Sequence, residues 1–312
     1  MAEGVSHALV TGGAGFVGSR LARALIAAGR KVTVLDDLSV GSRAAVPEGA
    51  RLVAGDVRDG AALAQALEGA DGVFHLAAKV SIRASVATFH EDADVNLMGT
   101  LALIRALEGS AVRRVVLASS MAVYPDRPAP VPIAEDTPLA PLSPYGTAKM
   151  AAERYLVQMG EAMGFDALPV RLFNVYGPGQ TYTPYVGVIT IFANRLTAGK
   201  PPVIFGDGGQ VRDFVHVDDV VRGLMAVMER GRGGRVYNIG SGAGRSVREV
   251  AQAVIDRIAP GTVPLHAPLD RIETRNSVAD ISRAREELAY APQADFARDV
   301  GPVIDGIVAG LG

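Results

Sequence analysis

The chain has 312 residues and no cysteine, so disulfide bonds and thiolate chemistry are excluded. Hydrophobic residues make up 49% and charged residues 21%, which is typical of a globular protein with a substantial core. The net charge of −2 argues against binding to nucleic acid, and no uncharged apolar run is long enough to span a membrane. The opening MAEGVSHALVTGG lacks the basic region of a secretory signal, and the five histidines lack metal-ligand spacing. We therefore expect a soluble, cytoplasmic protein without a metal site.

Short apolar runs alternate with amphipathic helical stretches along the first half of the chain. The expected strands span residues 7–11, 31–36, 51–54, 72–76, 114–119, 167–172 and 235–239. The expected helices span residues 18–28, 61–68, 93–108 and 147–163. Strands spaced by helices predict a parallel sheet that is covered on both faces, and the strands are accordingly apolar throughout.

The alternation weakens after residue 172, where segments rich in Gly, Pro and Tyr follow. This change predicts a second, smaller α/β domain at the C-terminal side of a doubly wound α/β domain. The proline-rich run 125–144 is expected to be an ordered loop rather than a linker. The first domain is expected to comprise residues 1–175 with a return segment at about 214–240, and the second residues 176–213 and 241–312.

The strand at 7–11 runs directly into TGGAGFVGS, and a helix follows. Gly12 or Gly13, together with Gly15 and Gly18, fits the spacing of a dinucleotide-binding fingerprint. These glycines allow a tight turn, close approach of the backbone to a pyrophosphate, and close packing of helix on strand. Free N–H groups at the helix start favour phosphate. The pattern predicts a Rossmann-type fold, against the alternative of a glycine-rich turn without a ligand.

Asp36 ends the second strand about 20 residues after the glycine loop, where a carboxylate binds the adenosine ribose. A carboxylate at this place repels a 2′-phosphate and so favours NAD over NADP, although Arg43 could accept such a phosphate. Asp56 and Val57, after the third strand, lie where the adenine edge is expected. The alternative for Asp56 is a helix N-cap.

The segment SPYGTAK, residues 143–149, places Tyr145 and Lys149 on one face of a helix. A free tyrosine has a pKa of about 10, and a nearby ammonium and a positively charged nicotinamide would both lower it. Lys149 could also hold the nicotinamide ribose. Ser119 and Ser120 end the fifth strand at the edge where such sheets bind ligands. Ser120 is expected to share a hydrogen bond with Tyr145 and a substrate hydroxyl, or else to be a turn serine.

The chain resembles the extended short-chain dehydrogenase/reductases of the NAD-dependent nucleotide-sugar epimerase/dehydratase family. The resemblance runs from residue 9 to about residue 290, through TGGAGFVG, LDDLSVGSR, GDVRD, HLAA, DVNLMGT, SSMAVY, SPYGTAK, RLFNVYGPGQ, FGDGGQVRDFVHVDD, YNIGSG and VADISRA. It implies NAD as the cofactor. The implied cofactor-binding residues are Gly12, Gly15, Phe16, Val17, Asp36, Asp37, Asp56, Val57, Leu76, Ala77, Ala78, Asn96, Ser119, Tyr145 and Lys149.

The resemblance also implies a reaction. Tyr145 takes the proton of the sugar 4-hydroxyl while C4 passes hydride to NAD, and the 4-keto sugar then rotates and receives hydride on its other face. Family members that dehydrate or decarboxylate carry acidic side chains just after the catalytic hydroxyl residue. Met121 and Ala122 stand there and cannot transfer protons. This difference favours 4-epimerisation of a UDP-hexose, UDP-glucose or UDP-galactose. The alternatives are a UDP-glucuronate 4-epimerase, a reductase or dehydratase of the same family, and a non-catalytic NAD-sensing module.

On the sugar-nucleotide side, the resemblance assigns Asn174, Arg212 and one of Arg271 and Arg275 to the diphosphate. Ser277 falls beside the C2 substituent of the sugar, where a small side chain would also admit UDP-GlcNAc and UDP-GalNAc. A cation from the loop KVSIRAS, which holds Lys79 and Arg83, would instead suit a uronate unless that loop is only solvated. The implied substrate-binding residues are Lys79, Ser120, Tyr145, Asn174, Arg212, Arg271, Arg275 and Ser277.

A homodimer is implied as well, built from the helices at about 92–108 and 147–163 of each subunit. Its seam would hold Met98, Leu101, Met150, Met159 and Met163. The alternative is that these side chains face the sheet of their own chain.

Overall fold

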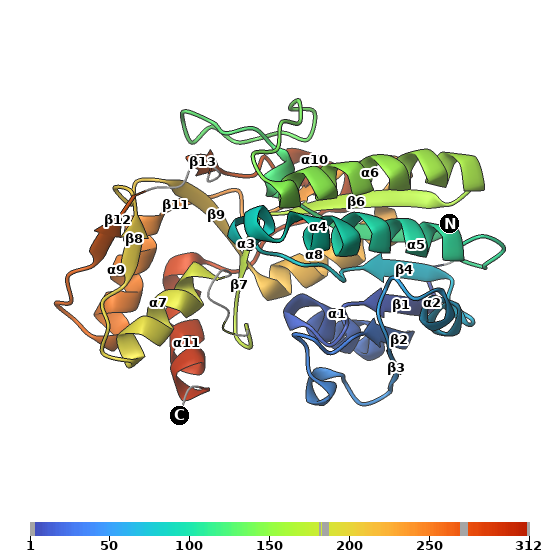
Figure 1. Ribbon diagram of the computed structural model, residues 1–312, viewed down its shortest axis with the longest axis horizontal. Coiled ribbons are helices and arrows are strands. Elements are labelled where there is room, and N and C mark those ends of the chain that lie inside the picture. Colours follow the sequence, from blue (N-terminus) through green and yellow to red (C-terminus); the bar gives the residue numbers. More distant parts are fainter. Residues whose placement is uncertain (1–3, 181, 183–186, 269–273, 311–312) are drawn as a thin grey trace.

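The structure is a computed structural model that describes residues 4–180, 182, 187–268 and 274–310. Its largest element is a seven-stranded parallel sheet with the order β10-β6-β5-β4-β1-β2-β3 (Figure 1). The strands are β1 (His7–Thr11), β2 (Lys31–Asp36), β3 (Ala50–Ala54), β4 (Gly72–His75), β5 (Arg114–Ser120), β6 (Asp166–Leu172) and β10 (Tyr237–Ile239).

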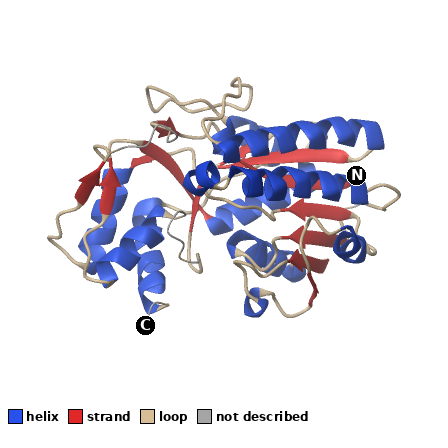
Figure 2. Ribbon diagram, viewed as in Figure 1, coloured by secondary structure: helices blue, strands red, loops and turns tan. Residues whose placement is uncertain are grey.

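Helices cover both faces of this sheet (Figure 2). One face carries α1 (Phe16–Ala27), α8 (Val217–Arg230) and α10 (Ser282–Leu288). The other carries α2 (Gly60–Leu67), α5 (Gly99–Ala106) and α6 (Pro144–Met163). The alternation of side chains along each strand divides the core between the two faces. In β1, for example, Ala8 and Val10 pack under α1 and α8, and Leu9 packs toward α2 and α5.

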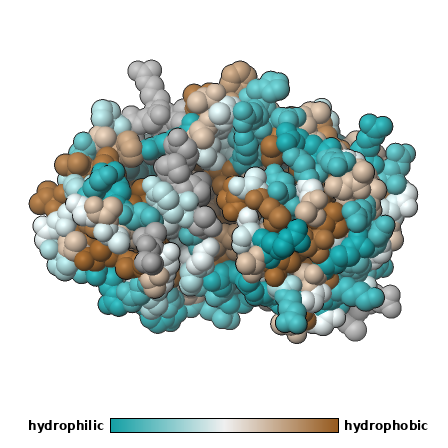
Figure 3. Space-filling view, turned by 60° about the horizontal axis from the view of Figure 1, so that its bottom comes forward, coloured by the Kyte–Doolittle hydropathy of each residue, from teal (hydrophilic) through white to brown (hydrophobic). Residues whose placement is uncertain are grey.

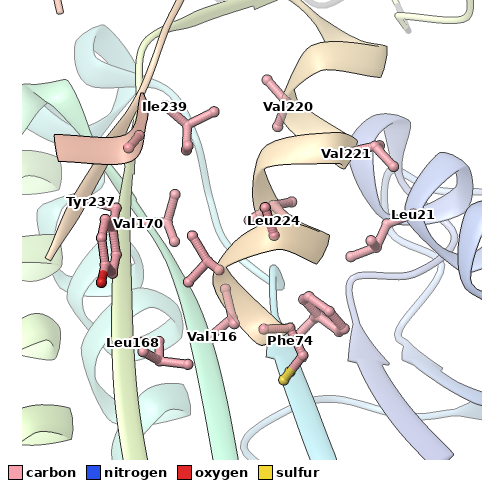
Figure 4. Close-up of a cluster of buried hydrophobic side chains, with 14 of the residues drawn as sticks. Leu21, Phe74, Val116, Leu168, Val170, Val220, Val221, Leu224, Tyr237 and Ile239 are labelled. Atoms are coloured by element: carbon pink, nitrogen blue, oxygen red, sulfur yellow. The ribbon is translucent and has the colours of Figure 1, made fainter. Parts of the chain in front are cut away.

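The core under α8 shows why strands from distant parts of the chain stay together. Figure 4 shows Val220 and Leu224 of α8 packed against Val116, Val170 and other strand residues. All are at most a few per cent exposed, and each fully buried aliphatic side chain contributes roughly 1.5–3 kcal/mol. The apolar stripe of α8 therefore fixes β10 beside β6, although 64 residues separate Leu172 from Tyr237.

The remaining strands form two smaller sheets at the other end of the molecule (Figure 1). The four-stranded sheet holds β7 (Asn174–Tyr176), β9 (Val211–His216), β11 (Gly244–Ser246) and β13 (Asn276–Ser277); the two-stranded sheet holds β8 (Val203–Phe205) and β12 (Leu265–Ala267). The helices α7 (Val188–Thr197), α9 (Val247–Ile258) and α11 (Phe296–Ala309) pack together around a separate core.

Most elements expected from the sequence are present, with ends that differ by at most three residues, and β1 and β2 have the expected bounds. The expected helix 93–108 is interrupted: α4 (Phe89–Ala93) leads into a π-helical turn, η2 (Asp94–Met98), before α5 begins. The short helix α3 (Ile82–Ala87) was not expected. Between the 3-10 turn η3 (Met121–Val123) and α6 the chain is an irregular loop, as predicted; a second 3-10 turn, η1, spans Arg43–Ala45. The boundaries of the two domains stay a prediction.

The outer surface mixes polar and apolar residues. A space-filling view of one face shows hydrophobic residues in brown interspersed with hydrophilic residues in teal (Figure 3). Over the described ranges, the search for a helix long and apolar enough to cross a membrane finds none.

Candidate active site

The glycine loop lies where the chain turns from β1 into α1, at the point where the sheet order reverses between β1 and β4. Gly12 has a φ of +68°, and a Cβ there would lie 2.8 Å from the backbone N of Ala77. Gly18 lies directly against the carbonyl of Gly12. These two glycines are required by the turn and by the contact between helix and loop.

The start of α1 fits the pyrophosphate of a dinucleotide. Gly15 is the N-cap, no side chain caps the helix, and its first turn holds no acidic residue. A Cβ on Gly15 would meet, among the described residues, only the carbonyl O of Gly12 at 3.3 Å. The backbone N–H groups of Phe16 and Val17 lie in the first turn of α1, where the helix dipole favours an anion.

The Asp36 carboxylate lies beside this loop, at the end of β2. It is buried and accepts hydrogen bonds from the N–H groups of Ala14 (2.9 Å) and Leu38 (2.8 Å). Asp36 therefore ties the glycine loop to β2, in the place that the ribose-binding acid should hold. The neighbouring Asp37 is exposed and accepts from the N–H and hydroxyl of Ser39.

Asp56 is not the N-cap that was considered as its alternative role. The N-cap of α2 is Asp59, whose side chain accepts from the N–H of Ala61 at 2.8 Å. Asp56 instead forms an ion pair with Arg58, which lowers the pKa of its carboxyl. The next residue, Val57, is buried against Gly99 at the start of α5.

The loop after β4 is held by two polar residues. The Thr11 hydroxyl accepts from the N–H groups of Leu76 and Ala77, both at 3.2 Å. The buried Asn96 amide, in the π-helical turn, bonds both the N–H (3.1 Å) and the C=O (2.9 Å) of Lys79. Leu76, Ala77 and Ala78 are half-buried beside Gly12. Asn96, predicted to bind cofactor, thus shapes the loop that borders the cofactor cradle.

The three predicted catalytic residues come together where β5 ends and α6 begins. Ser143 caps α6, with its hydroxyl accepting from Gly146 N at 3.1 Å, and Pro144 follows in the first turn. This start presents Tyr145 and Lys149 on the buried face of the helix. Ser120 lies close enough to the Tyr145 side chain to lower the pKa of its phenol, and Lys149 Nζ lies 6.0 Å from the centre of the Tyr145 ring.

Burial controls the ionisation of this pair. It raises the pKa of Tyr145 to about 12, opposed by the hydrogen bond from Ser120 and reinforced by the charge of Asp92. Burial also lowers the pKa of Lys149 to about 8, while the carboxylates of Asp92 and Glu153 act in the opposite direction. Next to them, His75 is neutral, because burial and the Lys149 charge lower its pKa to about 3. In the absence of a ligand, the phenol is protonated and Lys149 is the cation of the site.

A buried polar network lies behind these residues and was not foreseen. Arg171 of β6 pairs with Glu153 of α6 through Nε (3.0 Å) and Nη2 (2.8 Å), and the Ser119 hydroxyl also donates to Glu153. Arg171 Nη1 donates to Tyr124 Oη at 2.9 Å. The network joins the end of β5 to the helix that carries Tyr145. The position of Glu153, four residues after Lys149, is the sequence signal that could have indicated it.

Three of the residues assigned to the sugar nucleotide, Asn174, Arg212 and Ser277, lie on the small four-stranded sheet. Asn174 is opposite Phe214, and Ser277 is opposite Arg212; because residues 212 and 214 share one face of β9, all of these side chains do. Asn174 Oδ1 and Ser277 Oγ are buried and have no hydrogen-bond partner among the described residues. Unsatisfied buried polar atoms of this kind are rare and fit a ligand that completes them.

The predicted cations are engaged in other contacts. Arg212 donates to the backbone carbonyls of Thr274 and Arg275. The Arg275 guanidinium pairs with both carboxylate oxygens of Asp207, each at 2.8 Å. Lys79 is exposed and pairs with Glu91 at 2.5 Å. Arg271 lies outside the described residues.

The fold and the site together define a dinucleotide-binding α/β protein with a buried Ser-Tyr-Lys constellation. The model of the "NAD dependent epimerase/dehydratase family" matches residues 8–240. The chain belongs to this family, and its cofactor is NAD.

The sequence and the fold are similar to those of individual relatives over nearly the whole chain. UDP-glucose 4-epimerase of Mycolicibacterium smegmatis is 36% identical over 303 residues, covering 95% of this chain and 97% of the relative. UDP-glucose 4-epimerase of Thermotoga maritima, solved with UDP-glucose, is 32% identical with a TM-score of 0.93, covering 98% of this chain and 100% of that one. The Thermus thermophilus UDP-glucose 4-epimerase, solved with NAD, is 34% identical with a TM-score of 0.89, covering 96% and 98%.

Proposed function

We propose that this chain is an isomerase, an NAD-dependent 4-epimerase that interconverts UDP-glucose and UDP-galactose. One observation carries the proposal. The neighbouring Ser120 and Tyr145 side chains can transfer the proton of one sugar hydroxyl, while Met121 and Ala122, the next residues after Ser120, are buried and apolar. The site therefore lacks at those positions the extra acid and base that elimination of water requires.

In the proposed reaction, Tyr145 accepts the proton of the sugar 4-hydroxyl and later returns it. Ser120 holds the hydroxyl of Tyr145 and the 4-oxygen in one hydrogen-bonded row. The Lys149 ammonium and the positive charge of the bound cofactor favour the phenolate, whose formation burial opposes. NAD, when bound, supplies the hydride acceptor and donor at C4. Asp36 and the start of α1 hold its ribose and pyrophosphate.

The predicted substrate residues support a nucleotide sugar as the ligand. Asn174 and Ser277 offer unsatisfied buried atoms on one face of the small sheet, where Arg212 of β9 lies directly opposite Ser277. Arg212 and a second arginine, Arg271 or Arg275, are proposed to bind the diphosphate. The pairing of Lys79 with Glu91 and the stacking of Arg83 on the Phe205 ring, 3.7 Å from its centre, favour a neutral sugar over a uronate.

The test is a product analysis by NMR. Purified protein is incubated with NAD and separately with UDP-glucose, UDP-galactose and UDP-glucuronate. The proposal predicts that each neutral sugar yields its C4 epimer, with no net reduced nicotinamide. Conversion of UDP-glucuronate alone would establish the uronate alternative. Accumulation of reduced nicotinamide or of a dehydrated sugar would establish a reductase or dehydratase.

A second activity, on UDP-GlcNAc and UDP-GalNAc, is proposed from Ser277. The side chain is small and buried, and its hydroxyl has no partner among the residues described. Ser277→Tyr is expected to remove the acetamido activity and to keep most of the turnover of UDP-glucose. Ser277→Ala is the control: it keeps the position small, so it should leave the ratio of the two activities unchanged even if loss of the hydroxyl lowers both. Equal loss on both substrates in Ser277→Tyr would reject the role of Ser277.

We also propose that the enzyme acts as a homodimer in the cytoplasm. The helices α5 and α6 pack side by side, and apolar side chains are exposed on α6 and on the neighbouring α3, α4 and η2. Of the predicted seam, Met98 is exposed, whereas Leu101, Met150, Met159 and Met163 are partly buried against the core of their own chain. The exposed large residues in this region are Val86, Phe89, Met98 and Tyr155.

A further inference from the structure

Lys149 is a charged group in the interior. Only 2% of it is exposed, and its Nζ donates to the carbonyl of Ala118 at 3.0 Å. One carbonyl does not compensate an ammonium for the loss of water, and a buried charge generally persists only with an opposite charge nearby. The identity of that counter-charge decides whether Lys149 is an ammonium at neutral pH.

The carboxylates closest along α6 and β6 are already engaged. Glu153 makes a two-point ion pair with Arg171 and accepts the Ser119 hydroxyl, so its charge is neutralised by the guanidinium. Glu135, also buried, faces Arg283 at 3.6 Å. Each of these carboxylates has an arginine of its own, and of the two carboxylates that raise the pKa of Lys149 the larger effect comes from Asp92 rather than from Glu153.

Asp92 has the features of the missing partner. It lies on α4, which packs against α6, and only 2% of it is exposed. Its Oδ2 is fully buried and has no hydrogen-bond partner within the described ranges, and the nearby Asn96 side chain acts against the rise in its pKa that burial causes. Its charge acts on both Lys149 and Tyr145. The charged and titratable groups that face it are these two from α6 and Lys79 from the loop after β4.

We propose that Asp92 is the counter-ion that holds Lys149 in its ammonium form inside the protein, and thereby a positioning residue for the Tyr145–Lys149 pair. Asp92 touches neither sugar nor cofactor in this scheme; it acts through Lys149. The catalytic consequence rests on the proposed function, but the electrostatic coupling of Asp92 to Lys149 does not. Two carboxylates then act on Lys149. Glu153 ties α6 to β5 and β6 through Ser119 and Arg171, and Asp92 supplies the charge that balances the ammonium.

The direction of each effect follows from the charges. Burial lowers the pKa of Lys149 to about 8, and the Asp92 carboxylate raises it, so removing that carboxylate brings the pKa toward or below neutrality. The same carboxylate raises the pKa of Tyr145, so its removal makes the phenol more acidic. Burial raises the pKa of Asp92 itself, and the Lys149 and Lys79 charges oppose that rise.

The direct test is the titration of Lys149, which needs no activity. The chain has only four lysines, so the Cε resonances of lysine-labelled protein can be followed by NMR, with Lys149→Met assigning the signal. In Asp92→Asn the pKa of Lys149 should fall by at least about one unit. Glu161→Gln, which removes an exposed carboxylate from α6, should leave it unchanged. An unchanged Lys149 pKa in Asp92→Asn overturns the proposal.

Kinetics then link the pair to catalysis. If the protein epimerises, the alkaline limb of kcat/KM in Asp92→Asn should move to lower pH by the same amount as the Lys149 pKa. If the rate of Asp92→Asn fell equally at every pH and neither limb of its kcat/KM profile moved, Asp92 would act only in packing, and its proposed effect on catalysis would be rejected. A wild-type protein without epimerase activity would reject the proposed function while the NMR titration still decides the ion pair.

If Asp92→Asn does not fold, the charge pair is tested by comparing the stability of two further variants. Lys149→Met leaves the buried Asp92 without its partner, whereas the double variant Asp92→Asn, Lys149→Met removes both charges. Thermal unfolding should show the double variant to be more stable than Lys149→Met alone. A double variant that is equally or less stable, or that does not fold, contradicts a charge pair between these residues.

Discussion

Tyr145 shows how burial and chemistry oppose each other at a single residue. Only 6% of the side chain is exposed, and its pKa is raised to about 12, mainly by burial. A phenol in this state is a poor base at neutral pH. The hydrogen bond from Ser120 lowers the pKa, and the cationic Lys149 nearby favours the phenolate as well. The site is therefore assembled so that the base becomes effective only when a further positive charge, that of the cofactor, arrives.

Tyr145→Phe removes the hydroxyl and keeps the ring. We expect the fold and NAD binding to persist and turnover to fall by about 10²–10⁴-fold, the usual contribution of a positioned acid–base group. Initial rates and NAD calorimetry measure the two effects. Tyr155→Phe, on an exposed position of the same helix, serves as the control and should turn over normally. Full activity of Tyr145→Phe would exclude the residue as the base.

Lys149 should also give stability a characteristic pH dependence. Burial lowers its pKa to about 8 from the ordinary 10.5, so between these values the unfolded chain holds a proton that the folded chain lacks. Stability contributed by this group therefore rises with pH across that window. Relative to Lys149→Met, the free energy of unfolding of the native chain should rise by on the order of 1 kcal/mol per pH unit. Urea unfolding of both proteins across the window measures this; a constant difference between them would show that the ammonium is not destabilised by burial.

Among the elements, the turn from β1 to α1 is the most sensitive to a single methyl group. Gly12→Ala places a Cβ 2.8 Å from the N of Ala77 at a φ of +68°. The change should separate the loops after β1 and β4, cost about 1–2 kcal/mol from the backbone conformation alone, and weaken NAD binding at least about tenfold.

The matched control is Gly29→Ala, after the end of α1. Gly29 has a similar φ of +76°, but a Cβ there meets nothing within 4 Å. Urea unfolding should show a comparable backbone cost for both variants, whereas calorimetry should show normal NAD affinity for Gly29→Ala. Equal NAD affinity in the two variants would mean that the glycine loop does not form the cofactor cradle.

The elements of the large sheet were predictable because their signals are local. The apolar runs of β1, β2 and β5, and the Ser143–Pro144 start of α6, are readable within a few residues of sequence. The π-helical turn Asp94–Met98 was not, because its conformation depends on the contact of Asn96 with Lys79, 17 residues away. The periodicity of apolar residues therefore predicted a single uninterrupted helix through this segment.

The residues of the candidate site also fall into those with a local sequence signal and those without one. Ser120, Tyr145, Lys149 and the glycines were found from spacing and motif. The pairing of Arg275 with Asp207 and the burial of Asp92 depend on segments brought together only by the fold. Spacing cannot reveal that a charged residue is buried, nor that a predicted ligand-binding cation already has a partner.

At the scale of the whole molecule, exposed apolar residues on α4, η2 and α6 support the proposed dimer. A variant carrying Met98→Glu and Tyr155→Glu places two charges on this surface, where 50% and 45% of the residues are exposed. Light scattering after size exclusion should report a monomer for this variant and a dimer for the native chain. Val263→Glu, at a residue 78% exposed near β12, should stay dimeric. A native monomer, or a dimer that tolerates both charges, would reject this surface as the interface.

The central claim is that hydride leaves and returns at C4 while a proton leaves and returns at the 4-hydroxyl oxygen, so that the sugar is oxidised only transiently. UDP-galactose carrying deuterium at C4 is incubated with the purified protein and NAD, and the product is isolated and examined by NMR and mass spectrometry. We expect UDP-glucose that keeps its deuterium at C4, with no deuterium elsewhere in the sugar and no net reduced nicotinamide. Loss of the label from C4, its appearance at another carbon, or the absence of any C4 epimer would contradict transient oxidation at C4 by the Ser120–Tyr145–Lys149 site.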